Sequence, residues 1–382
     1  MSDEVSLTGV VEMAVRAEPL VQIIRNYTNA LRFLVQEILR NPSEYGKWRY
    51  VKRTKRIRWE QDIKKIHGFY EDLKGRFNLP PKFAIGCERE ASMIAKSVIN
   101  NEKNGGKRCA IKSYRARCDY QSYSIKFEGD KCYLRLQGVG EFEVGFNKKW
   151  LDKYNDWKLG DLIMKMRGKI IRLYVTLKKV VEIANPSEKA VAVDMNFSEI
   201  VVGSDETEAR FNTSLQRIMH LKNHIEKTQK KYNKQWLQRG IRKAISRWWR
   251  RINGITDDFV RQVSRKIVLF AKERGYDTIV LEDLNGLRHE QAKMKKLWRE
   301  RFTFFAYRKL QNWIEWQAKK EGLAVVYVNP KNSSRTCPKC KSLAKFENRM
   351  LVCKNCGFTM DRDSVAIINL TDKWLGVLRC GA

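Results

Sequence analysis

The chain of 382 residues carries 76 Lys and Arg against 43 Asp and Glu, so its formal charge at pH 7 is +33. Such an excess of one sign destabilises a compact protein by self-repulsion and favours a polyanionic partner, with nucleic acid preferred over a membrane surface. No apolar run approaches the ~18 residues that span a bilayer, and the acidic N-terminus lacks a signal-peptide core. We therefore expect two or three domains, no membrane partner, and a cytoplasmic location associated with the nucleoid of a prokaryote.

The first hundred residues are expected to combine one strand with several helices. Residues 7–15 predict a strand, whereas the apolar positions of residues 20–38 recur every three or four residues and predict an amphipathic helix. Pro42 ends that helix, and another helix is predicted at 84–99. We expect residues 17–104 to form a helical lobe.

A basic segment with interleaved aromatic residues lies at 47–65 within this lobe. Its cations would contact phosphate groups and its rings would stack on bases. The alternative is a solvated helical face whose aromatic residues are anchored in the core. The overall charge favours the first interpretation. The predicted nucleic-acid-binding residues here are Trp48, Arg49, Lys52, Arg53, Lys55, Arg56 and Arg58.

From about residue 108 the apolar pattern takes a two-residue period, which is typical of strands. Strands are predicted at 120–127, 132–136, 141–146 and 170–181. Glycine-containing turns connect the first three of them. We expect residues 105–184 to form a small antiparallel β-barrel together with residues 1–16, with the helical lobe inserted between the two parts.

The chain beyond residue 185 alternates strands and helices, which indicates an α/β sheet. Strands are expected on both sides of Asp194, directly before Glu282, and at 323–328. Helices are expected within 217–251 with a division at Gly240, from a cap at Thr256 to Gly275, and at 302–320.

The helical region 217–251 is the second strongly basic segment, with Glu226 as its one acid. For Trp248 and Trp249, packing in the core of a solvated helix pair and contact with nucleic acid are equally good explanations. Nucleic-acid binding is predicted for Lys230, Lys231, Arg242, Lys243, Arg247 and Arg250.

Four cysteines form two CxxC pairs separated by 12 residues, and they are Cys337, Cys340, Cys353 and Cys356. Thiolates at this spacing typically bind one tetrahedral Zn²⁺, so we predict a zinc ribbon at 337–357. Its function is that of a structural staple, and we favour an additional role in guiding a DNA strand. The other cysteines show no regular spacing, which indicates free thiols in a reducing compartment.

Three acids, Asp194, Glu282 and Asp363, lie at or just beyond predicted strand or helix edges. Carboxylates gathered by one sheet do not all stay ionised without cations. Two Mg²⁺ ions would offset the repulsion, activate water and stabilise the leaving oxygen of a phosphodiester. The chain has only four histidines, which argues against a His-based zinc hydrolase and against a Ser-His-Asp site.

Five stretches of the sequence together resemble a known family. They are VAVDMNFSEIVV, IVLEDLNG, NPKNSSRTCPKC, CKNCG and DRDSVAIINL. They are similar to the split RuvC nuclease motifs and zinc ribbon of TnpB proteins, insertion-sequence-encoded relatives of the type V CRISPR effectors. The resemblance is good from about residue 185 onward, and over residues 1–184 it rests on the layout of barrel and helical lobe.

This resemblance implies an RNA-guided DNA endonuclease whose partners are a guide RNA and double-stranded target DNA. It implies a RuvC/RNase H-like nuclease domain from 185–336 and 358–382, a wedge barrel from 1–16 and 105–184, and a recognition lobe at 17–104. Asp194, Glu282 and Asp363 match the metal ligands of the three motifs, in that order.

The sequence departs from the family pattern at two places. Met195 and Asn196 replace a glycine step after the first acid, and the residues after Asp363 differ from the usual D-x-N-A-A-x-N. Asp361 is an alternative third ligand, although the register of Ala366 and Asn369 favours Asp363. Since no carboxylate is lost, we expect an active enzyme. The alternatives are an RNA-guided repressor without cleavage, a plain zinc-ribbon RNA-binding protein, and an RNase H-like transposase or resolvase.

Overall fold

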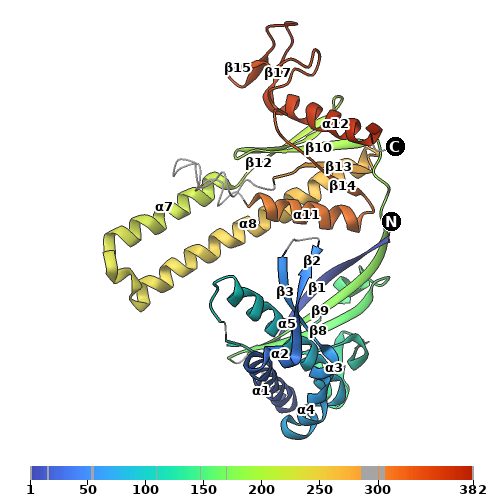
Figure 1. The fold of residues 1–382 in the computed structure, drawn as a ribbon, viewed down its shortest axis with the longest axis vertical. Coiled ribbons are helices and arrows are strands. Elements are labelled where there is room, and N and C mark those ends of the chain that lie inside the picture. The colour runs from blue at the N-terminus through green and yellow to red at the C-terminus, as the bar shows by residue number, and fades with distance from the viewer. Residues whose placement is uncertain are drawn as a thin grey trace. The chain divides into compact units, whose positions relative to one another are not determined.

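The computed structural model describes residues 2–14, 17–52, 56–108, 110–146, 148–168, 170–284, 300 and 306–380 (Figure 1). The chain divides into two compact units, one formed by Met1–Val5 with Val180–Ala382 and the other by Ser6–Lys179. Each unit combines helices with sheets around its own hydrophobic core, which confirms a multi-domain protein of mixed α/β class. The finer domain limits remain predictions. No helix in the described ranges is long and apolar enough to span a bilayer.

Two long helices organise the unit Ser6–Lys179. Helices α1 (Glu18–Arg40) and α5 (Pro81–Lys103) pack against each other. The apolar stripe of α1 is fully buried at Leu20, Ile24 and Leu31, as its three- and four-residue spacing predicts. The expected helices at 20–38 and 84–99 are thereby confirmed. The shorter helices of the unit are α2 (Pro42–Tyr45), α3 (Ile63–Ile66), α4 (Tyr70–Phe77) and α6 (Lys148–Asp152).

The strands from the first half of the chain form two larger sheets. One has the order β1 (Ser2–Ala14), β9 (Ile170–Glu182), β8 (Lys158–Arg167), β4 (Tyr114–Cys118), and the other has the order β5 (Tyr123–Glu128), β6 (Lys131–Leu136), β7 (Gly140–Val144). The tight turns make β5, β6 and β7 pair locally with one another. Among the described residues the strands therefore form two separate sheets and no single closed barrel. Strands β4 and β8 were not predicted.

The basic segment at 47–65 contains a β-hairpin, so the helical alternative considered for it is wrong. Strands β2 (Gly46–Val51) and β3 (Arg56–Gln61) pair in antiparallel register, with Trp48 opposite Trp59 and Arg49 opposite Arg58. Side chains alternate between the faces of a strand, which places the aromatic pair on one face and the arginine pair on the other. This two-residue period, and not a helical one, explains how aromatic and basic residues interleave.

The second unit is built on a five-stranded sheet. Its order is β12 (Glu208–Asn212), β11 (Glu199–Gly203), β10 (Ala190–Met195), β13 (Thr278–Glu282), β14 (Ala324–Val328). Strands β10, β13 and β14 are parallel, whereas β11 and β12 are antiparallel to their neighbours. The expected strands around Asp194, before Glu282 and at 323–328 are confirmed.

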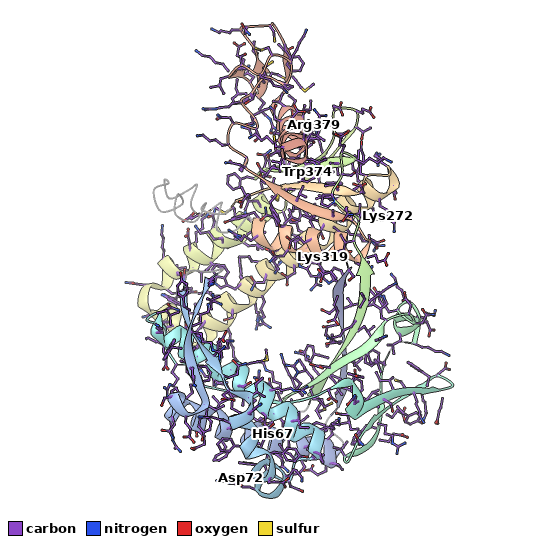
Figure 2. All side chains as sticks on the ribbon, turned by 45° about the vertical axis from the view of Figure 1, so that its right-hand side comes forward. His67, Asp72, Lys272, Lys319, Trp374 and Arg379 are labelled. Atoms are coloured by element: carbon purple, nitrogen blue, oxygen red, sulfur yellow. The ribbon has the colours of Figure 1, made fainter. Side chains whose placement is uncertain are left out.

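Helices cover both faces of this sheet (Figure 1). Val191 and Val193 pack towards α8 (Arg239–Glu273) and α11 (Tyr307–Lys320). The alternate residues Ala190 and Ala192 pack towards α12 (Arg362–Cys380). Figure 2 labels Trp374 on α12 and Lys319 on α11. Trp374 donates from Nε1 to the carbonyl of Ser187 at 2.9 Å, and Lys319 pairs with Asp3 at 2.7 Å.

The basic helical region forms a hairpin of α7 (Leu215–Tyr232) and α8. The break between them is the 3₁₀ turn Asn233–Leu237, so the predicted division at Gly240 is wrong. Helix α8 also continues through Thr256, whose hydroxyl donates to the Ile252 carbonyl within the helix, so Thr256 is not an N-cap. The physical reason is packing: Ile245 and Ile252 continue one apolar stripe of α8 against α7.

Candidate metal centres and nucleic-acid interface

Three acids converge on the sheet face that α12 covers. Alternate residues of a strand lie on the same face of a sheet. Asp194 is two residues beyond Ala192 in β10, and Glu282 is two residues beyond Val280 in β13, so both carboxylates project towards the face that α12 covers. The parallel register pairs Ala192 with Val280 and Val193 with Leu281, which brings Asp194 beside Glu282. Asp363 lies in the first turn of α12.

All three carboxylates are buried, with exposed fractions of 7% for Asp194, 8% for Glu282 and 1% for Asp363. Burial, and next the charge of Asp363, raises the pKa of Asp194. Burial, and next the charge of Asp194, raises the pKa of Glu282. Asp194 thus lies within electrostatic reach of both Asp363 and Glu282, and such a site favours either bound protons or a bound cation.

Asp363 is compensated by two guanidinium groups. Arg349 forms an ion pair with its Oδ2, and Arg362 Nε lies 3.3 Å from its Oδ1. Arg349 belongs to the turn between β15 (Lys345–Glu347) and β16 (Met350–Val352), and its φ of +73° is a left-handed value that is costly for arginine. The ribbon therefore places the Arg349 guanidinium against Asp363, and the backbone of Arg349 is strained in this position.

Asp361 occupies a different environment from Asp363. Its Oδ1 accepts the backbone N–H of Asp363 at 3.0 Å and of Ser364 at 3.4 Å, which is the contact of an N-cap for α12. It also pairs with Arg210 at 2.9 Å. Asp361 is therefore engaged as a helix cap, whereas Asp363 is buried and its charge acts on Asp194.

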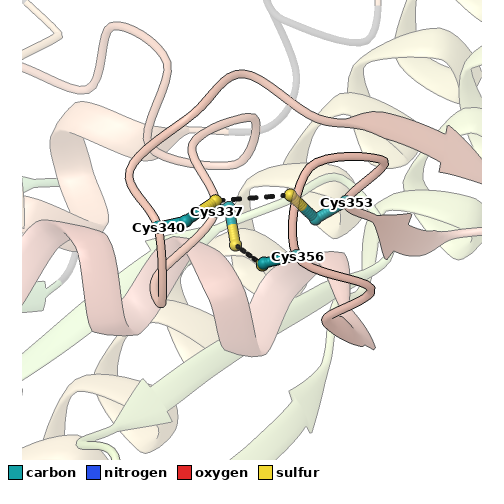
Figure 3. Close-up of side chains that lie close together, drawn as sticks. All are labelled: Cys337, Cys340, Cys353 and Cys356. Carbon is teal, nitrogen blue, oxygen red and sulfur yellow. Dashed lines mark hydrogen bonds between the residues drawn. The ribbon is translucent and has the colours of Figure 1, made fainter.

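The four cysteines converge on one point (Figure 3). Their Sγ atoms all lie within 4.8 Å of one another, with 3.6 Å between Cys337 and Cys356 and 3.5 Å between Cys340 and Cys353. Four sulfurs at the ~2.3 Å zinc–sulfur bond length of a tetrahedral site are about 3.8 Å apart, so the donor set fits zinc. Within the described ranges this is the only set of three or more His, Cys, Asp or Glu ligand atoms gathered so closely.

The local backbone explains why these cysteines meet. Lys341 donates its N–H to the Cys337 carbonyl and Gly357 donates to the Cys353 carbonyl, both at 2.9 Å. Lys341 and Gly357 have φ of +60° and +69°, so each CxxC pair closes into a tight left-handed turn. The small sheet of β15, β16 and β17 (Thr359–Asp361) supports both turns and leads into α12.

The predicted nucleic-acid residues are distributed over two exposed hairpins. In the β2–β3 hairpin, Trp48, Arg49, Lys52 and Arg58 are exposed, and Lys103 lies 4.2 Å from the centroid of the Trp48 ring. Trp59 is instead a core residue and donates from Nε1 to the Pro42 carbonyl. Arg53, Lys55 and the side chain of Arg56 lie outside the described residues.

The α7–α8 hairpin carries the second basic set entirely on its surface. The exposed cations are Lys230, Lys231, Arg242, Lys243, Arg247 and Arg250. Trp248 packs into the small core between the two helices and contacts His224, whereas Trp249 is exposed. The core interpretation is therefore right for Trp248 and wrong for Trp249.

Comparison with known proteins identifies relatives over most of the chain. The family model OrfB_IS605, a probable transposase, matches residues 173–288, and the Cas12f1-like TNB domain matches residues 307–370. A TnpB-like protein of Methanocaldococcus jannaschii is 29% identical over 267 residues, which cover 65% of this chain and 92% of that protein. A TnpB-like protein of Aquifex aeolicus is 30% identical over 132 residues, which cover 32% of this chain and 43% of that protein.

These matches support a relationship of the chain to the TnpB family. The fold of the chain is also similar to that of a Cas12f1–sgRNA–target DNA complex solved by cryo-EM. The TM-score is 0.59 at 15% identity, and the match covers 92% of this chain and 82% of that one. The CRISPR-associated endodeoxyribonuclease Cas12f1 of Sulfoacidibacillus thermotolerans is 26% identical over 131 residues, 34% of this chain and 29% of that protein.

Several residues of the site were not identified from the sequence. Asn196 donates to Asp194 at 2.5 Å and accepts from Arg362 at 3.4 Å, although the sequence marked it only as a departure from the family pattern. Arg210 was missed because Asp361 lies 151 residues away, and Arg349 was missed because its pairing with Asp363 depends on how the ribbon folds. One local signal existed for Arg349, since Asn348-Arg349 stands where a tight hairpin turn usually has Asn-Gly.

Proposed function

We propose that this chain is an RNA-guided DNA endonuclease in which Asp194, Glu282 and Asp363 form a RuvC-like site for two Mg²⁺ ions. The observation that carries the proposal is the convergence of three buried carboxylates on one sheet face, two of them with raised pKa values. A set of oxygen donors that repel one another when ionised suits hard divalent cations. Asp361 is excluded as third ligand in this proposal because it caps α12.

Bound Mg²⁺ would activate the attacking water and stabilise the leaving oxygen of the phosphodiester. The chain's own residues prepare the site. The Asn196 amide holds one oxygen of Asp194, and Gln311 donates to the Glu282 carbonyl at 2.8 Å, which fixes the end of β13. One Zn²⁺ on the four cysteines would stabilise the ribbon that presents Arg349.

The proposed partners are a guide RNA and a double-stranded target DNA. The formal charge of +33 and the two exposed basic hairpins support a nucleic-acid partner. The Cas12f1 relative is described as an endodeoxyribonuclease, and the similar structure was solved with guide RNA and target DNA. In a complex of this kind, base pairing between guide RNA and target DNA supplies the sequence specificity, while the protein binds the nucleic-acid backbone.

The test starts from the protein purified with its natural nucleic acid. We expect a bound RNA of discrete size, and cleavage of a matching DNA duplex after Mg²⁺ is added. Bound RNA without cleavage would indicate a guided repressor. Cleavage or strand transfer that persists after the RNA is removed would indicate a transposase or resolvase.

Arginine removal on the β2–β3 hairpin should weaken nucleic-acid binding in a salt-dependent way. The variant with Arg49→Ala and Arg58→Ala loses two exposed cations of one hairpin face. The slope of log K against log salt should become shallower by about 0.9 for each lost phosphate contact. The control is Lys131→Ala, which removes an exposed cation paired with Glu143 on another hairpin. An unchanged slope would place Arg49 and Arg58 away from the interface.

The raised pKa values predict that stability depends on pH through Glu282. Burial raises the pKa of Asp194 to about 7 and that of Glu282 to about 8. The folded protein thus binds these protons more tightly than the unfolded chain does, and the associated stability is complete near pH 4 and is lost as the pH rises through 7 to 8. Glu282→Gln avoids that loss, because its amide stays neutral at every pH in this range.

Thermal unfolding without added Mg²⁺ checks this prediction. The Gln variant should melt higher than the parent protein by on the order of 5 °C at pH 8, and the difference should shrink towards pH 5. Added Mg²⁺ should raise the melting temperature of the parent at pH 8 and leave that of the variant nearly unchanged. A difference that is constant with pH would mean that Glu282 is ionised normally in the folded protein.

A further inference from the structure

Arg210, on the edge strand β12, contacts four side chains, which are Glu199 of β11, Glu208 of its own strand, and Asp361 and Ser364 at the start of α12. Its Nη1 lies 3.1 Å from Glu199, and its Nε donates to Glu208 at 2.9 Å. Its Nη2 donates to Asp361 and to the Ser364 hydroxyl, each at 2.9 Å. A planar guanidinium satisfies several acceptors in fixed directions, which a lysine ammonium does not do.

The contacts close into a ring around the start of α12. The Ser364 hydroxyl accepts from Arg210 and donates to Glu208 at 2.7 Å. Asp361 accepts from Arg210 and from the first backbone N–H groups of the helix. Arg210 and Glu208 therefore hold residues 361 and 364, which lie on either side of Asp363 in the chain.

The direction of this first helical turn decides where the Asp363 carboxylate lies. Asp363 is 1% exposed and its charge acts on Asp194, while Asp361 and Arg210 remain partly exposed at the surface. A metal ligand must be held within about half an ångström of its working position. The hydrogen-bonded ring of Arg210, Glu208, Asp361 and Ser364 lies outside the group of buried acids. It restrains the backbone that carries Asp363.

We propose that Arg210 is a positioning residue, which fixes the Asp363 carboxylate for divalent-ion binding through Asp361 and Ser364. This inference rests on the proposed function, since it assumes that Asp363 is a metal ligand. In this role Arg210 contacts neither the substrate nor a metal ion. Its effect comes from the planar guanidinium group, which donates to several acceptors in fixed directions. The positive charge alone is not sufficient.

Two substitutions separate geometry from charge. Arg210→Lys keeps the positive charge and loses the planar guanidinium group, whereas Arg210→Ala loses both. The control is Arg217→Ala, because Arg217 is an exposed arginine that lines the same shallow cavity of about 360 Å³ as Arg210. Ser364→Ala removes one link of the ring and leaves Arg210 in place, so it serves as the milder variant if either Arg210 variant folds poorly.

The first measurement is Mn²⁺ binding to the zinc-loaded, full-length protein without nucleic acid, followed by electron paramagnetic resonance. Both Arg210 variants should bind Mn²⁺ about tenfold more weakly than the parent, Ser364→Ala should be weakened less, and Arg217→Ala should match the parent. The second measurement is cleavage by the guide complex over a range of Mg²⁺ concentrations. The half-saturating concentration should rise by a similar factor, with the rate at saturating Mg²⁺ within about twofold of the parent.

Unchanged Mn²⁺ affinity in both Arg210 variants would overturn the proposal, as would full affinity in Arg210→Lys alone. A loss of the saturating rate without a shift in metal dependence would also overturn it, because that result belongs to a general structural role. Failure of the proposed function gives a different result. In that case the parent protein itself would bind Mn²⁺ no better than Asp194→Ala does.

Discussion

Asp194→Ala or Glu282→Ala should lower the rate of target cleavage by at least about a thousandfold, since each removes a proposed ligand of the Mg²⁺ ions that would stabilise the transition state. Guide RNA and target DNA binding should persist, because both side chains are buried and the exposed cations of the two hairpins are untouched. The measurements are single-turnover cleavage and an equilibrium binding assay on the same preparations. Asp205→Ala, an exposed acid between β11 and β12, is the control that should cut normally.

The third acid allows a sharper version of this experiment. Asp363→Asn should lose cleavage like the other two, whereas Asp361→Asn should retain most of it. Asparagine caps a helix about as well as aspartate does, and the Asp361 oxygen that accepts two backbone N–H groups has a direct counterpart in the amide. The reverse pattern would make Asp361 the ligand. Near-normal cleavage by the Asp194 or Glu282 variant would end the assignment of the whole site.

Loss of the cysteine site should unfold the ribbon. Cys353→Ser removes a buried thiol of the four-cysteine cluster, and zinc binding at a site of this kind contributes on the order of 10 kcal/mol to local folding. We expect about one zinc per chain in the parent protein and a strong loss in the variant, with rapid proteolysis confined to residues 337–357. The matched control is Cys380→Ser, because Cys380 is exposed and lies outside the cluster.

Unfolding of the ribbon should also affect the acids, because Arg349 is held by the β15–β16 turn and pairs with Asp363. Cleavage by Cys353→Ser should therefore fall together with its zinc content. A variant that has lost zinc and still resists protease over 337–357 would show that the cysteines do not hold the ribbon together.

Local patterns in the sequence were sufficient for much of the site. The CxxC spacing identified all four sulfurs that the structure gathers, because the turn that closes each pair is contained in a few neighbouring residues. Apolar runs before Asp194 and Glu282 predicted the strands that carry them. Both runs are short, buried and bounded by polar residues, and this pattern depends little on the rest of the fold.

Other features depended on which elements pair with each other. The helical alternative for the basic segment at 47–65 was wrong, because its two-residue period belongs to a local hairpin. The break near residue 240 was misplaced, because α8 packs along α7 through one continuous apolar stripe. The predicted barrel also required knowledge of which edges pair, and the turns between β5, β6 and β7 direct those strands to one another.

The sequence by itself determined the four clustered cysteines, the central strands and the three candidate acids, because each is encoded by neighbours in the chain. Only the tertiary structure decided which acid is capped and which is buried, and which arginines hold them. Arg210 lies 151 residues from Asp361, and Arg349 reaches Asp363 across the ribbon. Such contacts form when folding brings remote segments together, so they leave no periodic trace in the sequence.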